Sequence, residues 1–348
     1  MPLLSVKQHL VRRLFACAVI SSCLLCPSCG NKQDEADVTA GEEATLGVFT
    51  SSLFSVCFID AFKGWAAGKL GGIIHTDDGG LNWYAQQSGV DFHLYDIEFV
   101  DEMSGWAVGN MGTVIHAEDG GNSWRSQESM TANILRSVAF IDKNRGWIVG
   151  DFATMLKTTN GGERWTVQEQ VKEVLSPKKK LFMPSLLDIN FVDENNCWAV
   201  GFPGVILRST DGGQTWELQE SPTSEVLNSV CFTDPLNGWI AGNLGIILNT
   251  LDGGRTWTLQ QSGVEYDLLR VKFVDSRNAW IVCYGGILHS GNGGRSWAPQ
   301  VSGAGHWFYS ITFGDRQHGW SVGDFGVIYT TSDAGMNWSP QTAKLSSG

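Results

Sequence analysis

The chain of 348 residues carries 24 Lys and Arg against 36 Asp and Glu, for a formal net charge of −12. This acidic balance argues against a broad nucleic-acid-binding surface, and a hydrophobic content of 43% fits a packed globular protein. Abundant Gly (42) and Trp (15) with few Pro (9) indicate many short strands and tight turns rather than helices.

Residues 1–29 resemble a bacterial lipoprotein signal. Basic residues precede the apolar run LFACAVI, and the small residues and cysteines of SSCLLCPSCG follow it. The apolar run is too short for a membrane span. In such signals a cysteine after small residues is lipidated, and here Cys23 or Cys29 is the candidate. The resemblance implies an extracytoplasmic protein anchored by lipid to a bacterial membrane, facing the periplasm, or the thylakoid lumen in a photosynthetic host.

Residues 30–45 are polar and acidic and are expected to form a disordered tether. The cysteines beyond the signal lie far apart, in or beside predicted strands, and we interpret them as free thiols rather than a disulfide framework. They are Cys57, Cys197, Cys231 and Cys283. The spacing CLLCPSC has no fourth ligand nearby, so no metal and no cofactor are expected.

From residue 46 to residue 340 the chain repeats itself. One tryptophan recurs at 83, 124, 165, 216, 257, 297 and 338, and a second at 65, 106, 147, 198, 239, 280 and 320. Each unit contains four short strand patterns separated by turn residues; in the second unit they are LYDIEFV, GWAVG, TVIHA and SWRSQ. A single four-stranded sheet cannot bury both its faces, whereas seven sheets stacked radially can.

The sequence therefore predicts an all-β fold, a seven-bladed β-propeller with four antiparallel strands in each blade. The expected blades lie near residues 53–87, 94–128, 135–169, 186–220, 227–261, 268–300 and 308–341.

The motif [S/T]-x-D-x-G-x-x-W recurs between the third and fourth strands of the units. It resembles the Asp-box of bacterial neuraminidase repeats, which implies that its Asp accepts backbone N–H groups across a turn and that its Trp is buried. Two units have Asn in place of Asp, which argues against a metal or acid–base role. The structural Asp-box residues are Asp78, Asp119, Asn160, Asp211, Asp252, Asn292 and Asp333.

A second acidic column ends the first strand of every unit, five residues before the G-W pair. We expect these side chains to cap the following turn through backbone amides, and the alternative of a ring of calcium sites is less favoured. Cys197 and Ala279 replace the Gly of the G-W pair in two units, which indicates that this Gly serves close packing. The column comprises Asp60, Asp101, Asp142, Asp193, Asp234, Asp275 and Asp315.

Because strands alternate in direction, both invariant turns lie at one end of the ring. The second–third turns and the connections between blades lie at the other, where the units diverge, and we call this end the variable rim. Its aromatic and polar tips are the predicted partner-binding surface, although such side chains could also pack on neighbouring blades. The candidates are Phe92, His93, Met111, Phe152, Phe202, Tyr266, Tyr284, His306, Trp307 and Phe325.

The fourth unit is preceded by ten additional residues. They contain a basic and hydrophobic stretch that is expected to project from the variable rim and to grip an acidic segment or a lipid surface, with a solvated loop as the alternative. Its candidate residues are Lys178, Lys179, Lys180 and Phe182.

Catalysis is not expected. Sialidases, which use the same repeat, need three arginines, a Tyr–Glu pair and a mobile Asp, whereas only Arg136 and Arg270 lie near the starts of the predicted inner strands. The alternative function is a carbohydrate-binding or degenerate sialidase-like propeller that uses Tyr284, His306 and Trp307 as a sugar platform.

From Leu53 to Trp338, the recurrent S-V-x-F-x-D-x-x-x-G-W-x-V-G-x-x-G-x-I-x-x-T-x-D-G-G-x-x-W resembles the photosystem II assembly and stability factors and their bacterial relatives. The resemblance implies a non-enzymatic, extracytoplasmic lipoprotein scaffold. Its expected partner is a protein, such as a membrane-protein assembly intermediate, with the membrane contacted through the lipid anchor and no nucleic acid bound.

Overall fold

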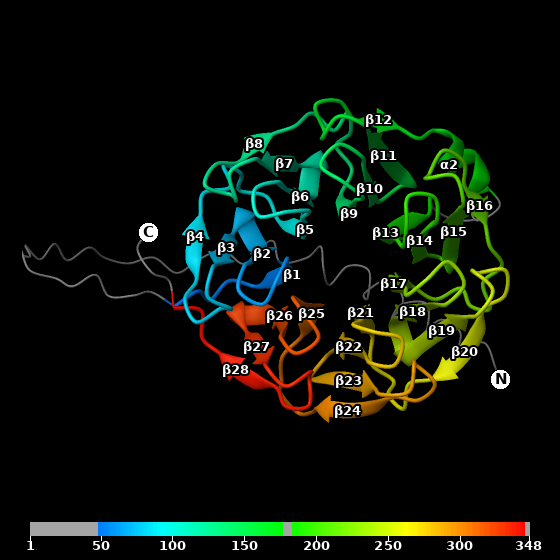
Figure 1. Cartoon of the computed structure of the whole chain (residues 1–348). Coiled ribbons are helices and arrows are strands. Elements are labelled where there is room, and N and C mark those ends of the chain that lie inside the picture. Colours follow the sequence, from blue (N-terminus) through cyan, green and yellow to red (C-terminus); the bar gives the residue numbers. More distant parts are fainter. Residues whose placement is uncertain (1–47, 177–182, 345–348) are drawn as a thin grey trace, which may run out of the picture. The chain divides into compact units, whose positions relative to one another are not determined.

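The computed structural model describes residues 48–176 and 183–344. Seven sheets, each of four antiparallel strands in chain order, form a ring (Figure 1). Residues from all seven first strands line a pocket, which we call the central channel. The predicted seven-bladed β-propeller is therefore confirmed. The predictions for Cys23, Cys29, Lys178, Lys179, Lys180 and Phe182, and for the signal and the tether, fall outside the described residues.

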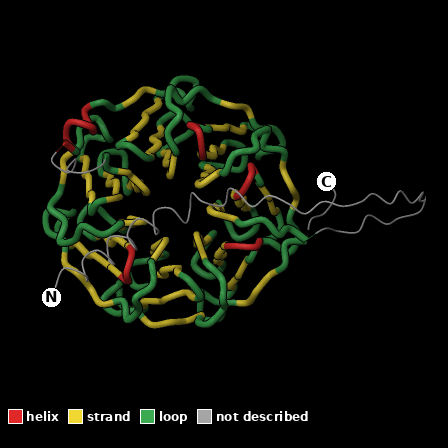
Figure 2. The backbone as a smooth tube through the Cα atoms, turned by 180° about the vertical axis from the view of Figure 1, so that it is seen from behind, coloured by secondary structure: helices red, strands yellow, loops and turns green. Residues whose placement is uncertain are grey.

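The first strand of each blade lies at the centre of the ring and the fourth at its outer edge, as the labels of Figure 1 show, and Figure 2 shows the same ring from behind. Blades 1 to 3 comprise β1 (Leu53–Phe58), β2 (Gly64–Gly68), β3 (Ile73–Thr76) and β4 (Tyr84–Gln86); β5 (Leu94–Phe99), β6 (Gly105–Gly109), β7 (Val114–Ala117) and β8 (Arg125–Ser126); and β9 (Leu135–Phe140), β10 (Gly146–Gly150), β11 (Thr154–Thr158) and β12 (Thr166–Val167).

Blades 4 and 5 comprise β13 (Ser185–Phe191), β14 (Cys197–Phe202), β15 (Val205–Ser209) and β16 (Glu217–Leu218); and β17 (Leu227–Phe232), β18 (Gly238–Gly242), β19 (Ile246–Thr250) and β20 (Thr258–Gln261). Blades 6 and 7 comprise β21 (Leu268–Phe273), β22 (Ala279–Cys283), β23 (Gly286–Ser290) and β24 (Ala298–Val301); and β25 (Phe308–Phe313), β26 (Gly319–Gly323), β27 (Ile328–Thr331) and β28 (Ser339–Gln341).

A repeated aromatic joint connects neighbouring blades. The Trp of each second strand is buried, and its ring lies against the Phe that ends the first strand of the next blade, stacked in five of the seven pairs. The same joint closes the ring: Trp320 of blade 7 lies 3.5 Å from Phe58 of blade 1, centroid to centroid, and its Nε1 donates to the Gly79 carbonyl oxygen at 3.0 Å. The segments before β1 and after β28 also pair, since Phe49 N donates to Ala343 O at 3.0 Å.

The Gly before each second-strand Trp makes room for this joint. A Cβ on Gly64 would lie 2.4 Å from the Phe58 ring, although Gly64 has no positive φ. Close packing against the Phe58 ring, rather than backbone conformation, therefore explains why Gly occupies this position. The ring pairs Trp147–Phe191 and Trp280–Phe313 are both tilted by 38°, the first in the blade with Cys197 and the second in a blade that keeps its Gly.

The Asp-box turns are held by local hydrogen bonds. Asp78 Oδ1 accepts the Asn82 N–H at 2.9 Å, while the Thr76 hydroxyl accepts the Gly80 N–H at 2.8 Å. Equivalent bonds to the backbone N–H four residues on are made by Asp119, Asn160, Asp211, Asp252, Asn292 and Asp333.

The Asp that ends each first strand caps the following turn. Asp60 Oδ1 accepts the amides of Phe62 and Lys63, both at 2.7 Å. The same pair of bonds occurs at Asp101, Asp142, Asp193, Asp234, Asp275 and Asp315.

The additional residues before blade 4 begin with a helix, α2 (Gln170–Val174), that the repeat pattern did not predict. Val171 and Leu175, four residues apart on one helix face, are fully buried against Met155 and Trp216 of the neighbouring blades. This part of the segment therefore packs on the propeller. None of the helices formed by residues 48–176 and 183–344 has the length and apolar character needed to cross a membrane.

Candidate interaction rim and central channel

The two ends of the propeller are built from different connections. At the Asp-box end, Gly79 N of the third–fourth turn donates to Phe62 O of the first–second turn at 2.8 Å. At the variable rim, Leu70 N of the second–third turn donates to His93 Nδ1 of the blade connection at 3.1 Å. The connections that differ between units thus meet on one face.

Five second–third turns at the variable rim expose an apolar side chain in a strained backbone. Their tip residues have φ between 53° and 58°, and their side chains are 56–73% exposed. A left-handed conformation costs a non-glycine residue about 1 kcal/mol, and an apolar side chain gains nothing from water there. Local stability therefore does not account for these tips. They are Leu70, Met111, Phe152, Leu244 and Phe325, and we call them the rim tips.

The other predicted rim residues divide by exposure. Phe92, Tyr266 and Tyr284 are exposed, whereas His93, Phe202, His306 and Trp307 are half-buried. Phe202 differs from the rim tips because it precedes a cis peptide bond to Pro203 and ends β14.

The mouth of the channel contains an aromatic cluster that the sequence analysis missed. Every first strand has a register shift near its start, at the second residue in six blades and at the third, Leu187, in β13. Such a bulge re-aims a side chain. Phe54 thereby contacts Tyr95 and Tyr309, with ring centroids 5.6 and 5.4 Å apart. Arg136 lies 5.0 Å over the Tyr95 ring and forms two hydrogen bonds with Asp151, at 2.9 and 3.0 Å.

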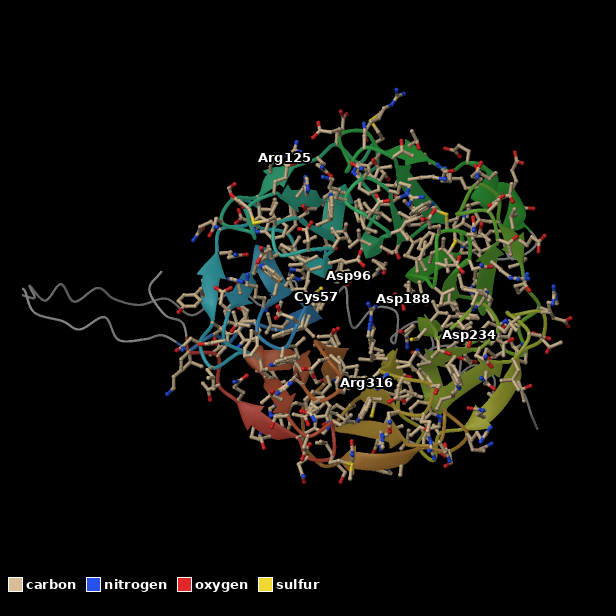
Figure 3. All side chains as sticks on the ribbon, in the orientation of Figure 1. Cys57, Asp96, Arg125, Asp188, Asp234 and Arg316 are labelled. Atoms are coloured by element: carbon tan, nitrogen blue, oxygen red, sulfur yellow. The ribbon has the colours of Figure 1, made fainter. Side chains whose placement is uncertain are left out.

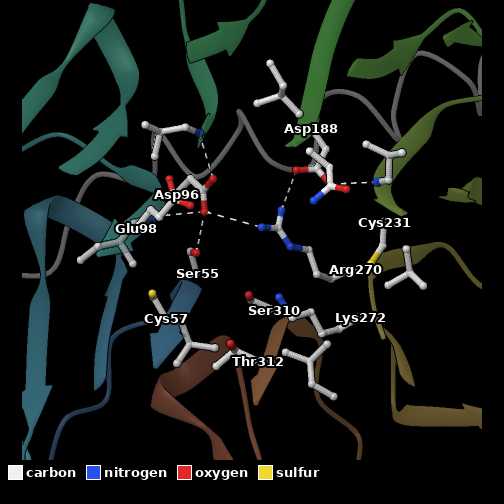
Figure 4. Close-up of a pocket in the computed structure, with 18 residues that line it drawn as sticks. Ser55, Cys57, Asp96, Glu98, Asp188, Cys231, Arg270, Lys272, Ser310 and Thr312 are labelled. Carbon is white, nitrogen blue, oxygen red and sulfur yellow. Dashed lines mark hydrogen bonds and ion pairs between the residues drawn. The ribbon is translucent and has the colours of Figure 1, made fainter. Parts of the chain in front are cut away.

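Below this mouth, a polar network crosses the channel. Asp96 and Asp188 lie at the centre of the ring (Figure 3) and are 4% and 2% exposed. Arg270 lies between them (Figure 4). Its guanidinium donates to Asp188 at 3.0 Å and is 4.0 Å from Asp96. The Ser137 hydroxyl lies within 3.1 Å of both carboxylates. One cation thus compensates two buried anions.

The sequence held one signal of this network. The residue after the bulge in each first strand is, in chain order, Ser55, Asp96, Ser137, Asp188, Ser229, Arg270 and Ser310. Serine alternates with a charged residue at these equivalent positions, but the pairing of blade 6 with blades 2 and 4 requires the closed ring.

The next layer of the channel contains Cys57, Glu98 and Lys272. Together with the layer of Asp96, Asp188 and Arg270 it lines a cavity of about 130 Å³. Burial, with the neighbouring Asp96 carboxylate, raises the pKa of Glu98 to about 8. Burial also raises the pKa of the Cys57 thiol to about 12, which makes it a poor nucleophile. Among residues 48–176 and 183–344, no group of three or more His, Cys, Asp or Glu is arranged to hold a metal ion.

We expect Glu98→Gln to stabilise the protein at high pH only. The folded state keeps the Glu98 proton up to a pKa of about 8, whereas the unfolded chain releases it near 4.5. The wild type therefore loses stability as pH rises between these values. At pH 8.5 the variant should be more stable by about 3 kcal/mol, allowing for water in the channel, and near pH 4.5 the two should match. Urea unfolding across this range measures the difference; a gap that does not change with pH would contradict the assignment.

The comparisons with known proteins agree on the fold. The model of the family described as photosynthesis system II assembly factor YCF48 matches residues 35–128, 82–167, 123–218, 179–258 and 214–306. A solved structure of YCF48 bound to D1 peptide is 22% identical, with a TM-score of 0.67, and the alignment covers 85% of this chain and 96% of that one. YCF48 from Cyanidioschyzon merolae is 21% identical with a TM-score of 0.68, and the alignment covers 82% of this chain and 97% of that one.

A GH74 xyloglucanase from Xanthomonas campestris is also similar in structure. It is 12% identical with a TM-score of 0.68, and the match covers 86% of this chain but 56% of the enzyme. At such identity the likeness concerns the fold alone. A search of the curated proteins returns no match.

Proposed function

The chain belongs to the photosynthesis system II assembly factor YCF48 family, as its repeats predicted, and from this premise we propose that it is a non-enzymatic scaffold that binds a protein partner through the variable rim. One solved member of this structural group carries a D1 peptide, which supports a protein ligand. We further propose that the scaffold is a lipoprotein held at the extracytoplasmic face of a bacterial membrane, where it assists a membrane-protein assembly intermediate. In a photosynthetic host this intermediate would be that of photosystem II.

The observation that carries the proposal is the set of rim tips. Five equivalent turns keep a large apolar residue in a backbone conformation that favours Gly or Asn, and each side chain is mostly exposed. Contact with a partner removes such side chains from water, which offsets the cost of presenting them. Half-buried His306 and Trp307, the exposed Tyr tips and Phe92 extend the same surface.

We expect the double variant Phe152→Asn, Phe325→Asn to keep a stability close to that of the wild type and to bind its partner at least tenfold more weakly. Asn tolerates the left-handed region better than Phe, so removing the strain offsets the lost side-chain contacts to within about 1 kcal/mol. Two interface anchors together are worth more than 1 kcal/mol of binding. Thermal unfolding measures the first effect, and titration with native membranes and with a synthetic D1 peptide measures the second.

The matched control is Phe62→Asn with Leu236→Asn, which changes two exposed apolar residues at the Asp-box end. It should leave binding unchanged. A photo-cross-linking residue at position 152 or 325, but not at 62, should capture a membrane protein. Cross-links from position 62 alone would place the interface on the opposite end. Hydrolysis of a sialoside or xyloglucan by the purified chain would instead establish an enzyme.

A further inference from the structure

Three aromatic side chains of blades 6 and 7 form a notch in the variable rim. The Tyr284 ring stands between the other two, 6.1 Å from Tyr266 and 5.1 Å from Trp307, centroid to centroid. Tyr266 is 55% and Tyr284 41% exposed. The ring planes of Tyr266 and Tyr284 are inclined by 63°, and those of Tyr284 and Trp307 by 57°. The three rings therefore form the walls of a notch rather than one flat surface. We call these three residues the aromatic notch.

A shortened turn creates the notch. In four other blades the second–third connection contains a 3₁₀ turn of three residues, but Tyr284 and Gly285 alone join β22 to β23. Tyr284 thereby pairs with Trp307 as an isolated β-bridge. Gly303 and Gly305, in the loop that leads to Trp307, have φ of 71° and 72° and open space where a side chain would lie. The loop thus leaves the approach to the rings uncovered.

The surroundings of the notch are acidic. The segments that build it, residues 262–267, 284–285, 302–307 and 324–326, contain Glu265, Asp267 and Asp324 but neither Lys nor Arg. They also contain His306, whose Nδ1 lies 3.5 Å from Asp324, so Glu265 and Asp267 are the carboxylates without a basic neighbour in these segments. Backbone contacts position two of these carboxylates: Asp267 accepts Leu244 N at 3.0 Å, and Asp324 accepts Trp307 N at 3.1 Å. Negative charge and the electron-rich faces of the rings favour the same kind of ligand, a cation.

We propose that the aromatic notch binds a Lys or Arg side chain of the protein partner, a specificity that rests on the proposed function of the rim. A cationic head with an aliphatic stem satisfies both the inclined rings and the carboxylates. A sugar ring stacks best on an exposed flat face, whereas Trp307 is half-buried with Tyr284 tilted against it. The geometry therefore favours a basic side chain within an extended, partly apolar peptide over a carbohydrate.

A random dodecapeptide library displayed on phage tests the proposal, with the wild-type protein as bait and Tyr284→Ala for counter-selection. We expect the enriched peptides to carry Lys or Arg beside apolar residues. Synthetic copies should bind at least tenfold more weakly to Tyr284→Ala and to Asp267→Asn, and more weakly as salt rises. Replacing the basic residue of a peptide by norleucine should cause a similar loss. Phe62→Ala, an exposed aromatic at the Asp-box end, is the matched control and should bind normally.

Three results would overturn the proposal. They are an enriched pool that is neutral or acidic, equal binding by Tyr284→Ala in a protein whose Tm is unchanged, and xyloglucan oligosaccharide binding that is lost in Trp307→Ala. A different result would overturn the role of the notch but leave the proposed function of the rim intact. If Tyr284→Ala retains the native partner while Phe152→Asn with Phe325→Asn loses it, the rim binds a protein but the notch does not recognise a cation.

Discussion

Replacing Arg270 by Leu is expected to destabilise the protein by about 3–5 kcal/mol at pH 7, because one guanidinium compensates two buried carboxylates. Asp188 and Asp96 are almost fully buried, and without the cation they would repel each other across the channel. Burial already raises the pKa of Asp188, and Arg270 is the main group that opposes this shift. The variant should therefore lose less stability near pH 5, where the Asp188 carboxyl takes up a proton more readily.

Urea unfolding of Arg270→Leu, of Asp188→Asn and of the double variant measures the coupling between the two side chains. The double variant should recover part of the loss, since the neutral amide at position 188 would no longer leave an anion unpaired. Arg125→Leu is the matched control because Arg125 pairs with Glu163 at the surface and should contribute less than about 1 kcal/mol. A loss at position 270 no larger than at position 125 would show that water, rather than Arg270, solvates the channel carboxylates.

The second large effect is expected at the joint that closes the ring. Trp320→Ala should cost about 3–5 kcal/mol, since the indole is buried, stacks in parallel on Phe58 and donates to Gly79. Trp320→Phe keeps most of the apolar contact and removes the donor, so about 1–2 kcal/mol is expected. Thermal unfolding and limited proteolysis measure the loss and the opening of the ring between blades 7 and 1.

Trp147→Phe provides the comparison within the same fold. The Trp147 ring is equally buried, but its Nε1 has no hydrogen-bond partner among the described residues, and its Phe191 neighbour is tilted. The substitution there should therefore cost less than Trp320→Phe. Equal losses at both positions would mean that the hydrogen bond to Gly79 contributes nothing and that packing alone closes the ring.

The propeller was predictable because its determinants are local and repeated. Each unit carries its own two tryptophans, its Asp-box and its strand-ending Asp, and the turn hydrogen bonds of Asp78 and Asp60 join residues no more than four positions apart. Seven copies of one pattern identify the residues that the fold requires, and the divergent connections then identify the variable rim.

What the repeat could not predict depends on contacts between distant units or on departures from the pattern. Arg270 meets Asp188 and Asp96, which lie 82 and 174 positions earlier, only because the ring closes and brings blades 2, 4 and 6 to one channel. The left-handed backbone of the rim tips and the bulge that turns Phe54 into the mouth depend on register, which side-chain periodicity does not specify.

The sequence alone thus determined the architecture, the family and which end of the ring varies. Tertiary structure decided which side chains meet: it joined Tyr266, Tyr284 and Trp307 into the aromatic notch and packed α2 on blades 3 and 4. The physical reason is that a repeated local pattern sets the conformation of each blade, whereas charge pairing and ring contacts arise from the distances that closure of the ring imposes.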